Sequence, residues 1–430
     1  MEYKMFLTDE EKDILNGSKG EVMAKVAKSV VMYGEVFDAK RLVPVTAPSH
    51  LVTSFGISLM KAVFAIMDEI NDAGVTTIGK FTVDPRPLDY ENVKCNLLEK
   101  LVFGIIYGKQ KDYEEQLKKT GLKDSNAFSC TCYMEEVGNI PKKGDILSWA
   151  ESSAVVYANS VIGARCNRNS GIIEMFGAIL GKVPEFDLLT DEGRKATWIV
   201  QIKTTKKPEA QVLGSAIGMK VMSEVPYIKG LDKFIGKELN AQTKDYLKDM
   251  GAATASNGAV GLYHVENLTP EAVELKDALI KDKAKVYVID DAELERVKKN
   301  YPVIWKNADA KPSRCFIGCP HLSYNQLIEW TDRIGKELEK QGKKKVSLET
   351  VFTAAPDVVA HFKENKEYYD RFISYGTKIS SICPLMYMNN PICGKRAVVT
   401  NSNKLRTYTT ARYYTDEEIA GIAVRGDIAR

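Results

Sequence analysis

Three cysteines that are far apart in the sequence each stand where a predicted strand passes into a loop. Cys319 follows the segment SRCFIG, Cys383 follows KISSI, and Cys132 ends a short extended run. Open α/β sheets bind ligands outside the carboxyl ends of their strands, so these thiols can converge on one site. Thiolates suit zinc or iron–sulfur clusters, and a set of three leaves one coordination position open. Cys130 and Cys132 share a face of an extended segment, so either can be the third ligand.

A second group of chemically useful residues lies in the stretch GDILSWAESSAVVYANSVIGARCNR. Pro and Gly are absent from residues 149–162, which predicts a helix that Asp145 can cap and Gly163 can end. Most of its positions are apolar, which predicts burial on nearly all sides. Buried polar groups need partners, either protein groups or a substrate. The polar candidates on this helix are Ser152, Ser153 and Asn159.

Cationic and polar residues elsewhere are candidates for binding an anionic substrate. Arg165 and Arg168 follow the predicted helix and offer planar guanidinium groups for bidentate anion binding. We predict that Arg165 binds a substrate carboxylate. Further candidate substrate contacts are His50, Ser54 and Lys404.

The elements that must position these residues alternate between strand and helix patterns. Residues 196–202 alternate as a strand, residues 284–289 form another, and a helix is expected over 323–341. This alternation predicts an α/β fold with mainly parallel sheets. The region 1–408 is expected to form several α/β lobes around one site. Residues 409–430 are expected to be a charged peripheral tail.

The composition limits the classes of function. The chain has 430 residues and a formal net charge of +3, which does not favour nucleic acid as a main partner. No apolar run reaches the length of a membrane span, and the acidic N-terminus lacks a signal-peptide core, so we expect a cytoplasmic protein without membrane partners. Eight cysteines in such a chain favour reduced thiols, metal sites or catalysis over disulfides.

Several motifs around these residues give the sequence a resemblance to the large, catalytic subunit of the aconitase X family. They are CYMEEVGN, GDILSWAESSAVVYANSVIGAR, LYHVENLTPEA, FIGCPHLS and VVTNSNK, and they extend from Arg41 to about Tyr408. The resemblance implies an aconitase-like, three-lobed α/β scaffold without the swivelling small domain. It also implies an iron–sulfur cluster, [4Fe-4S], [3Fe-4S] or [2Fe-2S], held by Cys132, Cys319 and Cys383.

The activity that the resemblance implies is that of a hydro-lyase acting on a small hydroxy carboxylate. The main expectation is dehydration of cis-3-hydroxy-L-proline, and the alternative is a phosphomevalonate dehydratase large subunit. In this family a small swivelling-domain subunit is expected to supply a catalytic serine, so we expect a heteromeric complex. If no such subunit exists, Ser54, Ser152 or Ser153 is the candidate base.

Two further interpretations stay open from the sequence. The same thiols can bind zinc, with His321 as a fourth ligand. The second interpretation is a non-catalytic homologue. Its support is the unusual segment DPRPLDY, residues 84–90, where family members carry a Thr-rich run.

Overall fold

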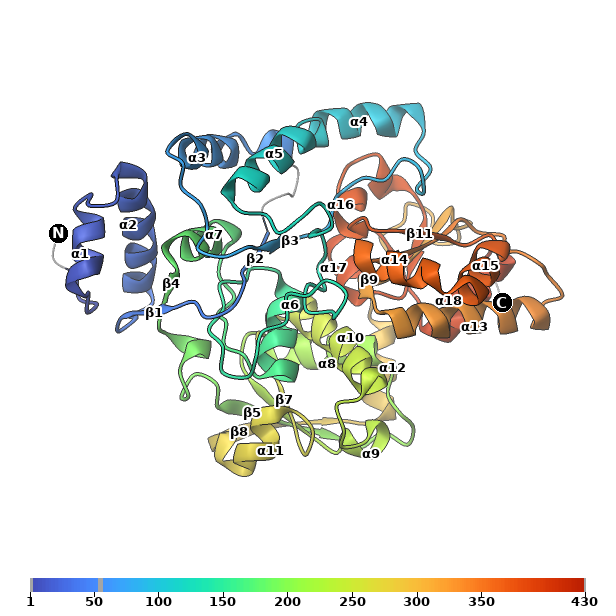
Figure 1. The fold of residues 1–430 in the computed structure, drawn as a ribbon. Helices are drawn as coiled ribbons and strands as arrows, with labels where there is room; N and C mark the ends of the chain where they lie inside the picture. Colours follow the sequence, from blue (N-terminus) through green and yellow to red (C-terminus); the bar gives the residue numbers. More distant parts are fainter. Residues whose placement is uncertain (1–2, 53–56, 429–430) are drawn as a thin grey trace.

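Two parallel β-sheets form the frame of the molecule (Figure 1). The computed structural model describes residues 3–52 and 57–428. The first sheet has the strand order β7-β6-β5-β8 and the second has the order β11-β10-β9-β12-β13, and every pairing within them is parallel. The α/β class with mainly parallel sheets is therefore confirmed.

Helices cover the four-stranded sheet, as the alternation of strand and helix patterns in the sequence predicted. Every second residue of β5, the segment ATWIVQI, is buried, because one face of the strand packs against the helices. The helices α8 and α10 lie against each other over this sheet (Figure 1). The elements of this region are β5 (Ala196–Ile202), α8 (Ala210–Val221), β6 (Pro226–Lys229), α9 (Asp232–Ile235), α10 (Ala241–Asn257), β7 (His264–Val265), α11 (Pro270–Leu275), β8 (Ile280–Ile289) and α12 (Asp291–Lys299).

The five-stranded sheet is built around β9 (Arg314–Leu322), in which all nine residues are buried. The chain places β10 and β11 on one side of β9, and then crosses to place β12 and β13 on the other. Such a reversal of strand order opens a crevice at the carboxyl ends of the strands. The other elements here are α13 (Tyr324–Lys340), β10 (Thr350–Ala354), α14 (Pro356–Glu364), α15 (Lys366–Ser374), β11 (Lys378–Ser380), α16 (Pro384–Met388), β12 (Val398–Thr400), α17 (Asn403–Tyr408), β13 (Arg412–Tyr413) and α18 (Asp416–Arg425).

The N-terminal part of the chain forms helices and short strands, with α1 and α2 at the left and α3 to α5 at the top of Figure 1. Its β1 pairs antiparallel with β4, and β2 pairs parallel with β3. None of the helices within the described ranges is both long and apolar enough to cross a membrane. The elements are α1 (Asp9–Leu15), α2 (Glu21–Val36), β1 (Leu42–Pro44), β2 (His50–Leu51), η1 (Ile57–Leu59), α3 (Lys61–Asp72), β3 (Thr82–Val83), α4 (Leu97–Tyr107), α5 (Gln110–Thr120), α7 (Gly171–Leu180) and β4 (Lys182–Pro184).

The central helix begins later than the sequence predicted. It consists of α6 (Ser152–Tyr157), followed by one π-helical turn over Ala158–Ile162, and Glu151 rather than Asp145 caps its N-terminus. The carboxylate of Asp145 instead accepts hydrogen bonds from Thr46 Oγ1 and from a nearby backbone N–H. The predicted end is confirmed, since Gly163 adopts the left-handed conformation with φ of 81°.

The last residues are not a peripheral tail, so that expectation is wrong. β13 extends the five-stranded sheet, and α18 buries residues 419–424. Ile419, Ile422 and Ala423 belong to the same hydrophobic core as β9 and α13. The charged residues that suggested a tail lie mainly in the first turn of α18, where acidic side chains interact favourably with the helix dipole.

A buried carboxyl group on α7 links the stability of this fold to pH. Glu174 is 1% exposed, and its Oε1 atom has no hydrogen-bond partner. Burial raises the pKa of Glu174 from 4.5 to about 8, against the effect of the hydrogen bonds with Ser148 and Asn169. Folding favours the protonated form of Glu174. Its contribution to the free energy of unfolding is therefore fully present below pH 4.5 and is lost progressively as the pH rises to about 8.

Replacement of Glu174 by Gln removes the charge and keeps an amide that can bond Ser148. We expect it to raise the free energy of unfolding at pH 7 by an amount on the order of 3 kcal/mol, and to change it little at pH 4.5. Urea titrations at the two pH values measure this difference. Glu115→Gln, at an exposed ion pair, is the control and should show no such pH dependence. Equal effects of Glu174→Gln at both pH values would contradict the assignment.

Candidate active site

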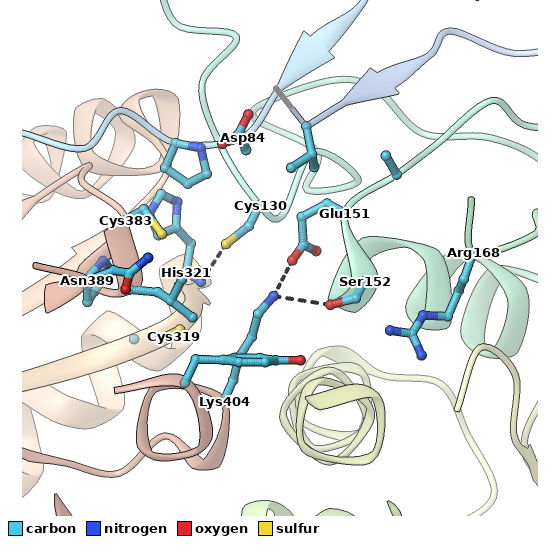
Figure 2. A pocket seen from close by; sticks show the side chains of 17 residues that line it. Asp84, Cys130, Glu151, Ser152, Arg168, Cys319, His321, Cys383, Asn389 and Lys404 are labelled. Carbon is cyan, nitrogen blue, oxygen red and sulfur yellow. Dashed lines mark hydrogen bonds and ion pairs between the residues drawn. The ribbon is translucent and has the colours of Figure 1, made fainter. Parts of the chain in front are cut away.

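A pocket of about 550 Å³ opens at the carboxyl ends of the five-stranded sheet (Figure 2). Residues from both halves of the chain line it, and they include the end of β9 and the segments that follow β11 and β12. This is the crevice that the reversal of strand order predicts. Its lining side chains with polar or sulfur atoms are Asp84, Cys130, Glu151, Ser152, Arg168, Cys319, His321, Cys383, Asn389, Lys404 and Tyr408.

Three thiols line one side of this pocket, and they are those of Cys130, Cys319 and Cys383 (Figure 2). Cys383 is the N-cap residue of α16 and follows β11, as predicted. Cys319 lies within β9, because this strand continues to Leu322, beyond the predicted end. Cys132 does not line the pocket. It is fully buried in the hydrophobic core, and its thiol is hydrogen-bonded to Thr82.

The structure places Cys130 rather than Cys132 at the pocket, and the reason is local. The prediction that both share a face assumed an extended segment, but the chain turns at this point, with Met134 N–H bonded to the carbonyl of Thr131. The first cysteine therefore faces the pocket and the second faces the core. Backbone N–H of His321 donates to Cys130 Sγ at 3.3 Å, which fixes the position of this sulfur.

The three pocket thiols are held in their protonated form by their surroundings. Burial raises the pKa of Cys130 to about 12, and burial also raises the pKa values of Cys319 and Cys383. The nearby charge of Lys404 acts in the opposite direction on all three. A bound metal would displace these protons, because thiolates rather than thiols are metal ligands. Within the described ranges, no three His, Cys, Asp or Glu side chains already stand close enough to bind one metal ion.

A buried ion pair lies beside the thiols. Lys404 Nζ contacts Glu151 Oε1, and it also lies 3.4 Å from Ser152 Oγ, as Figure 2 shows. The other carboxylate oxygen of Glu151 accepts hydrogen bonds from Ser153 Oγ at 2.6 Å and from Ala154 N–H at 2.7 Å. Ser152 thus faces the pocket, while Ser153 is turned inward to hold the carboxylate.

Both members of the ion pair are charged. Burial acts to raise the pKa of Glu151, but the charge of Lys404 and the hydrogen bonds outweigh it, and the pKa is lowered. Burial acts to lower the pKa of Lys404, but the charge of Glu151 and its hydrogen bond outweigh burial and raise it. The lysine is therefore a fixed cation at the pocket and not a proton acceptor.

The two histidines that the sequence singled out are both buried and neutral, since burial lowers the pKa of each to about 4. His321 lines the pocket, but its Nδ1 bonds Ser129 Oγ at 3.2 Å and its Nε2 bonds the carbonyl of Ile382 at 3.0 Å. It is not free to be a fourth zinc ligand. His50 lies behind the pocket wall, with Nδ1 at 2.9 Å from Thr82 Oγ1 and no partner for Nε2.

Asn159 does not reach the pocket either. Its amide nitrogen donates to the carbonyls of Cys166 and Gly261 at 2.8 and 2.9 Å, and its oxygen accepts from the buried guanidinium of Arg194. The side chain satisfies backbone groups where the π-helical turn ends, which is a structural role.

Arg165 also lies outside the pocket, so the structure does not support its predicted carboxylate contact. Its guanidinium bonds Asp191 and donates to the carbonyl of Leu189 at 2.9 Å. Arg168 lies in the pocket instead, because residues three apart in an extended segment point to opposite faces. Ser54 falls outside the residues that the structure describes.

Arg168 is the pocket cation without a bonded partner among the described residues. Figure 2 shows its guanidinium across the pocket from the three thiols, with Lys404 and Glu151 between them. Of these residues, Arg168 was predicted only as a general anion-binding candidate. Glu151 was not predicted, although a carboxylate directly before two serines in the longest motif indicates a polar site. Asp84 and Pro85 of the unusual DPRPLDY segment also line the pocket.

The sequence and the fold are those of a known class of dehydratases. Residues 4–192 match the family model for the aconitase X first domain, and residues 196–299 match that for the second domain. The chain belongs to the aconitase X family, and it is a dehydratase, a hydro-lyase, of that family.

The similar proteins with assigned names fall into two groups. The chain is 32% identical to the phosphomevalonate dehydratase large subunit of Thermococcus kodakarensis, over 94% of this chain and 95% of that protein. It is 25% identical to the cis-3-hydroxy-L-proline dehydratase of Hypocrea jecorina, over 75% of this chain but only 52% of that protein. The crystal structure of Thermococcus kodakaraensis aconitase X in its holo form matches with a TM-score of 0.79 and 28% identity, covering 97% of this chain and all of that one.

The Glu151–Lys404 pair can be tested through stability alone. Lys404→Met leaves a buried carboxylate without its counter-charge, and we expect it to lower the free energy of unfolding by about 3–5 kcal/mol. Adding Glu151→Gln to Lys404→Met should restore a large part of this loss, because the uncompensated charge is then gone. Urea denaturation of the single and double variants gives the coupling energy. Additive effects of the two changes would show that the pair does not act as a unit.

Proposed function

We propose that this chain is the large subunit of a phosphomevalonate dehydratase. The observation that carries the proposal is the match to such a subunit over nearly the full length of both proteins. The hydroxyproline dehydratases are less similar, and this chain spans about half of their length. The expectation of cis-3-hydroxy-L-proline as the substrate therefore has less support than the alternative.

We further propose that Cys130, Cys319 and Cys383 hold an iron–sulfur cluster. The donor set fits, since three thiols with no disulfide line one pocket at the strand ends. In a [4Fe-4S] or [3Fe-4S] cluster each thiolate would bind a different iron atom, so the sulfurs need not already stand within reach of one ion. When bound, the cluster would supply a Lewis acid for the substrate hydroxyl.

Single changes of these cysteines test the ligand set. Cys130→Ser, Cys319→Ser and Cys383→Ser should each lose iron and sulfide after anaerobic purification, because a serine hydroxyl is a poor ligand for a cluster. Cys132→Ser is the matched control, two residues from Cys130 but turned into the core, and it should retain the cluster. Iron and sulfide analysis with visible absorption measures both. Loss of iron in Cys132→Ser but not in Cys130→Ser would restore the ligand set first expected from the sequence.

The remaining pocket residues have roles that follow from charge and position. The fixed ammonium of Lys404 and the hydroxyl of Ser152 lie next to the thiols, where they can bind the carboxylate and orient the reacting end. Arg168, on the opposite side, offers a bidentate contact to a phosphate. A substrate with an anion at each end, such as phosphomevalonate, suits this arrangement.

Replacing Arg168 should therefore weaken the binding of phosphomevalonate more than it slows the chemical step. We expect Arg168→Ala to raise KM roughly 30- to 100-fold, corresponding to the loss of about 2–3 kcal/mol, with a smaller effect on kcat. Arg168→Lys keeps the charge without the planar fork and should be intermediate. Arg165→Ala, three residues away and outside the pocket, is the control. An unchanged KM in Arg168→Ala would remove this residue from the substrate site.

The proton acceptor is proposed to come from a second polypeptide. In the described part of the pocket, Lys404 is held protonated, both ring nitrogens of His321 are occupied, and Glu151 is bound by Lys404, Ser153 and Ala154. Dehydration needs a base within hydrogen-bond reach of the carbon-bound proton. The relatives are named as large subunits, which implies a small one, and we propose that it supplies a catalytic serine.

Reconstitution tests the proposed function directly. The purified chain with its iron–sulfur cluster should not turn over phosphomevalonate alone and should do so after addition of the small subunit. Parallel assays with cis-3-hydroxy-L-proline distinguish the two substrates. Turnover of hydroxyproline but not of phosphomevalonate would contradict the proposed substrate, and turnover by the isolated chain would show that it contains its own base.

A further inference from the structure

The outer face of α4 carries a row of exposed aliphatic side chains, which we call the α4 patch: Leu97, Leu98, Leu101 and Ile105. Their exposed fractions are 85%, 54%, 64% and 61%. Leu101 follows Leu97 and Leu98 by four and three residues, and Ile105 follows Leu101 by four, which places the row on one side of the helix. Single exposed apolar residues are ordinary, but a contiguous set of this kind marks an interaction site.

The opposite face of α4 is already used for packing within this chain. Phe103 and Tyr107 are buried there, so the helix is apolar on two sides. Gly104 lies in the middle of the helix between Leu101 and Ile105, and a Cβ atom at this position would meet nothing within 4 Å. The chain itself therefore does not require a glycine, which is unfavourable inside a helix. Its small size becomes useful if another surface approaches the α4 patch closely.

The α4 patch is connected to the pocket wall through α16. The ring of Phe103 lies 5.1 Å from that of Tyr387, and Tyr107 OH donates to the carbonyl of Met386 at 3.1 Å. The first residues of α16, Pro384 and Leu385, line the pocket. Figure 1 shows α4 along the upper edge of the molecule, with α16 beneath it. A partner seated on α4 would thus rest on the lobe that forms one wall of the pocket.

We propose that the α4 patch is the docking surface for the small subunit of this enzyme. This inference rests on the proposed function, which requires a second polypeptide to complete the site. The hydroxyproline dehydratases support the choice of occupant. This chain matches about half of each of them, so the polypeptide of those relatives contains a further part that this chain does not match. The fitting partner is a protein domain with an apolar face that covers the aliphatic row.

Two other occupants are outcomes of the test. A membrane surface is disfavoured because helices that lie on membranes carry many basic residues beside the apolar face, whereas α4 has one lysine, Lys100. A second copy of this chain would pair α4 with α4 and would appear as a dimer of the isolated protein.

The experiment measures binding of the separately purified small subunit, from the organism of this chain, to wild type and to Leu101→Asp and Ile105→Asp. Isothermal titration gives Kd, light scattering gives the mass, and thermal melting with iron content checks that each variant is folded. Ile304→Asp is the matched control, since Ile304 is 57% exposed and lies in the loop after α12. We expect Kd to rise at least tenfold in each α4 variant and to stay unchanged in the control.

Activity at saturating small subunit should return to near the wild-type kcat in both variants, because the pocket itself is untouched. The binding measurement needs no substrate, so its result is independent of which hydroxy acid is turned over. Unchanged Kd in both α4 variants would overturn the proposal, as would the absence of any complex with the wild-type chain. A wild-type dimer broken by Leu101→Asp would assign the surface to a second copy. Loss of binding to phosphatidylglycerol vesicles in Leu101→Asp, without an effect on Kd, would assign it to a membrane.

Discussion

The buried ion pair between Glu151 and Lys404 joins two parts of the chain that are 253 residues apart. Glu151 caps the central helix, while Lys404 lies in the first turn of α17, just after β12. Removing either partner would leave a largely buried charge without its counter-charge, so the pair favours the arrangement in which the two parts of the chain close together. That arrangement is also what places Ser152 and the pocket thiols side by side.

The topology of the five-stranded sheet determines what surrounds this pair. Because strand order reverses at β9, the last part of β9 and the residues after β11 and β12 meet at one crevice, although they are far apart in sequence. The central stretch adds Cys130, Glu151 and Ser152 from the opposite side. The thiols, the fixed cation and Arg168 then lie in a row across the pocket. This arrangement supports our proposal that the substrate has two anionic ends and binds with its reacting end at the thiols.

Much of the fold could be predicted from the sequence, because the relevant signals are local. The strand expected over 196–202 and the helix expected over 323–341 have bounds within a residue of those observed for β5 and α13. Of the pocket lining, the sequence predicted Cys319 and Cys383, because their positions at or near strand ends are local signals. The choice between Cys130 and Cys132 depends on a turn, and the choice between Arg165 and Arg168 depends on which face of an extended segment is buried. The burial of α18 likewise depends on packing against distant helices.

The central claim is that Cys130, Cys319 and Cys383 hold an iron–sulfur cluster in the pocket beside Lys404. The most direct measurement is anomalous diffraction at the iron absorption edge from crystals of anaerobically purified protein. Our account predicts one iron peak, or a group of peaks, in contact with the sulfur atoms of these three residues and facing Lys404. Iron bound by Cys132 instead of Cys130, or zinc in place of iron at an absorption edge scanned on the same crystal, would contradict it.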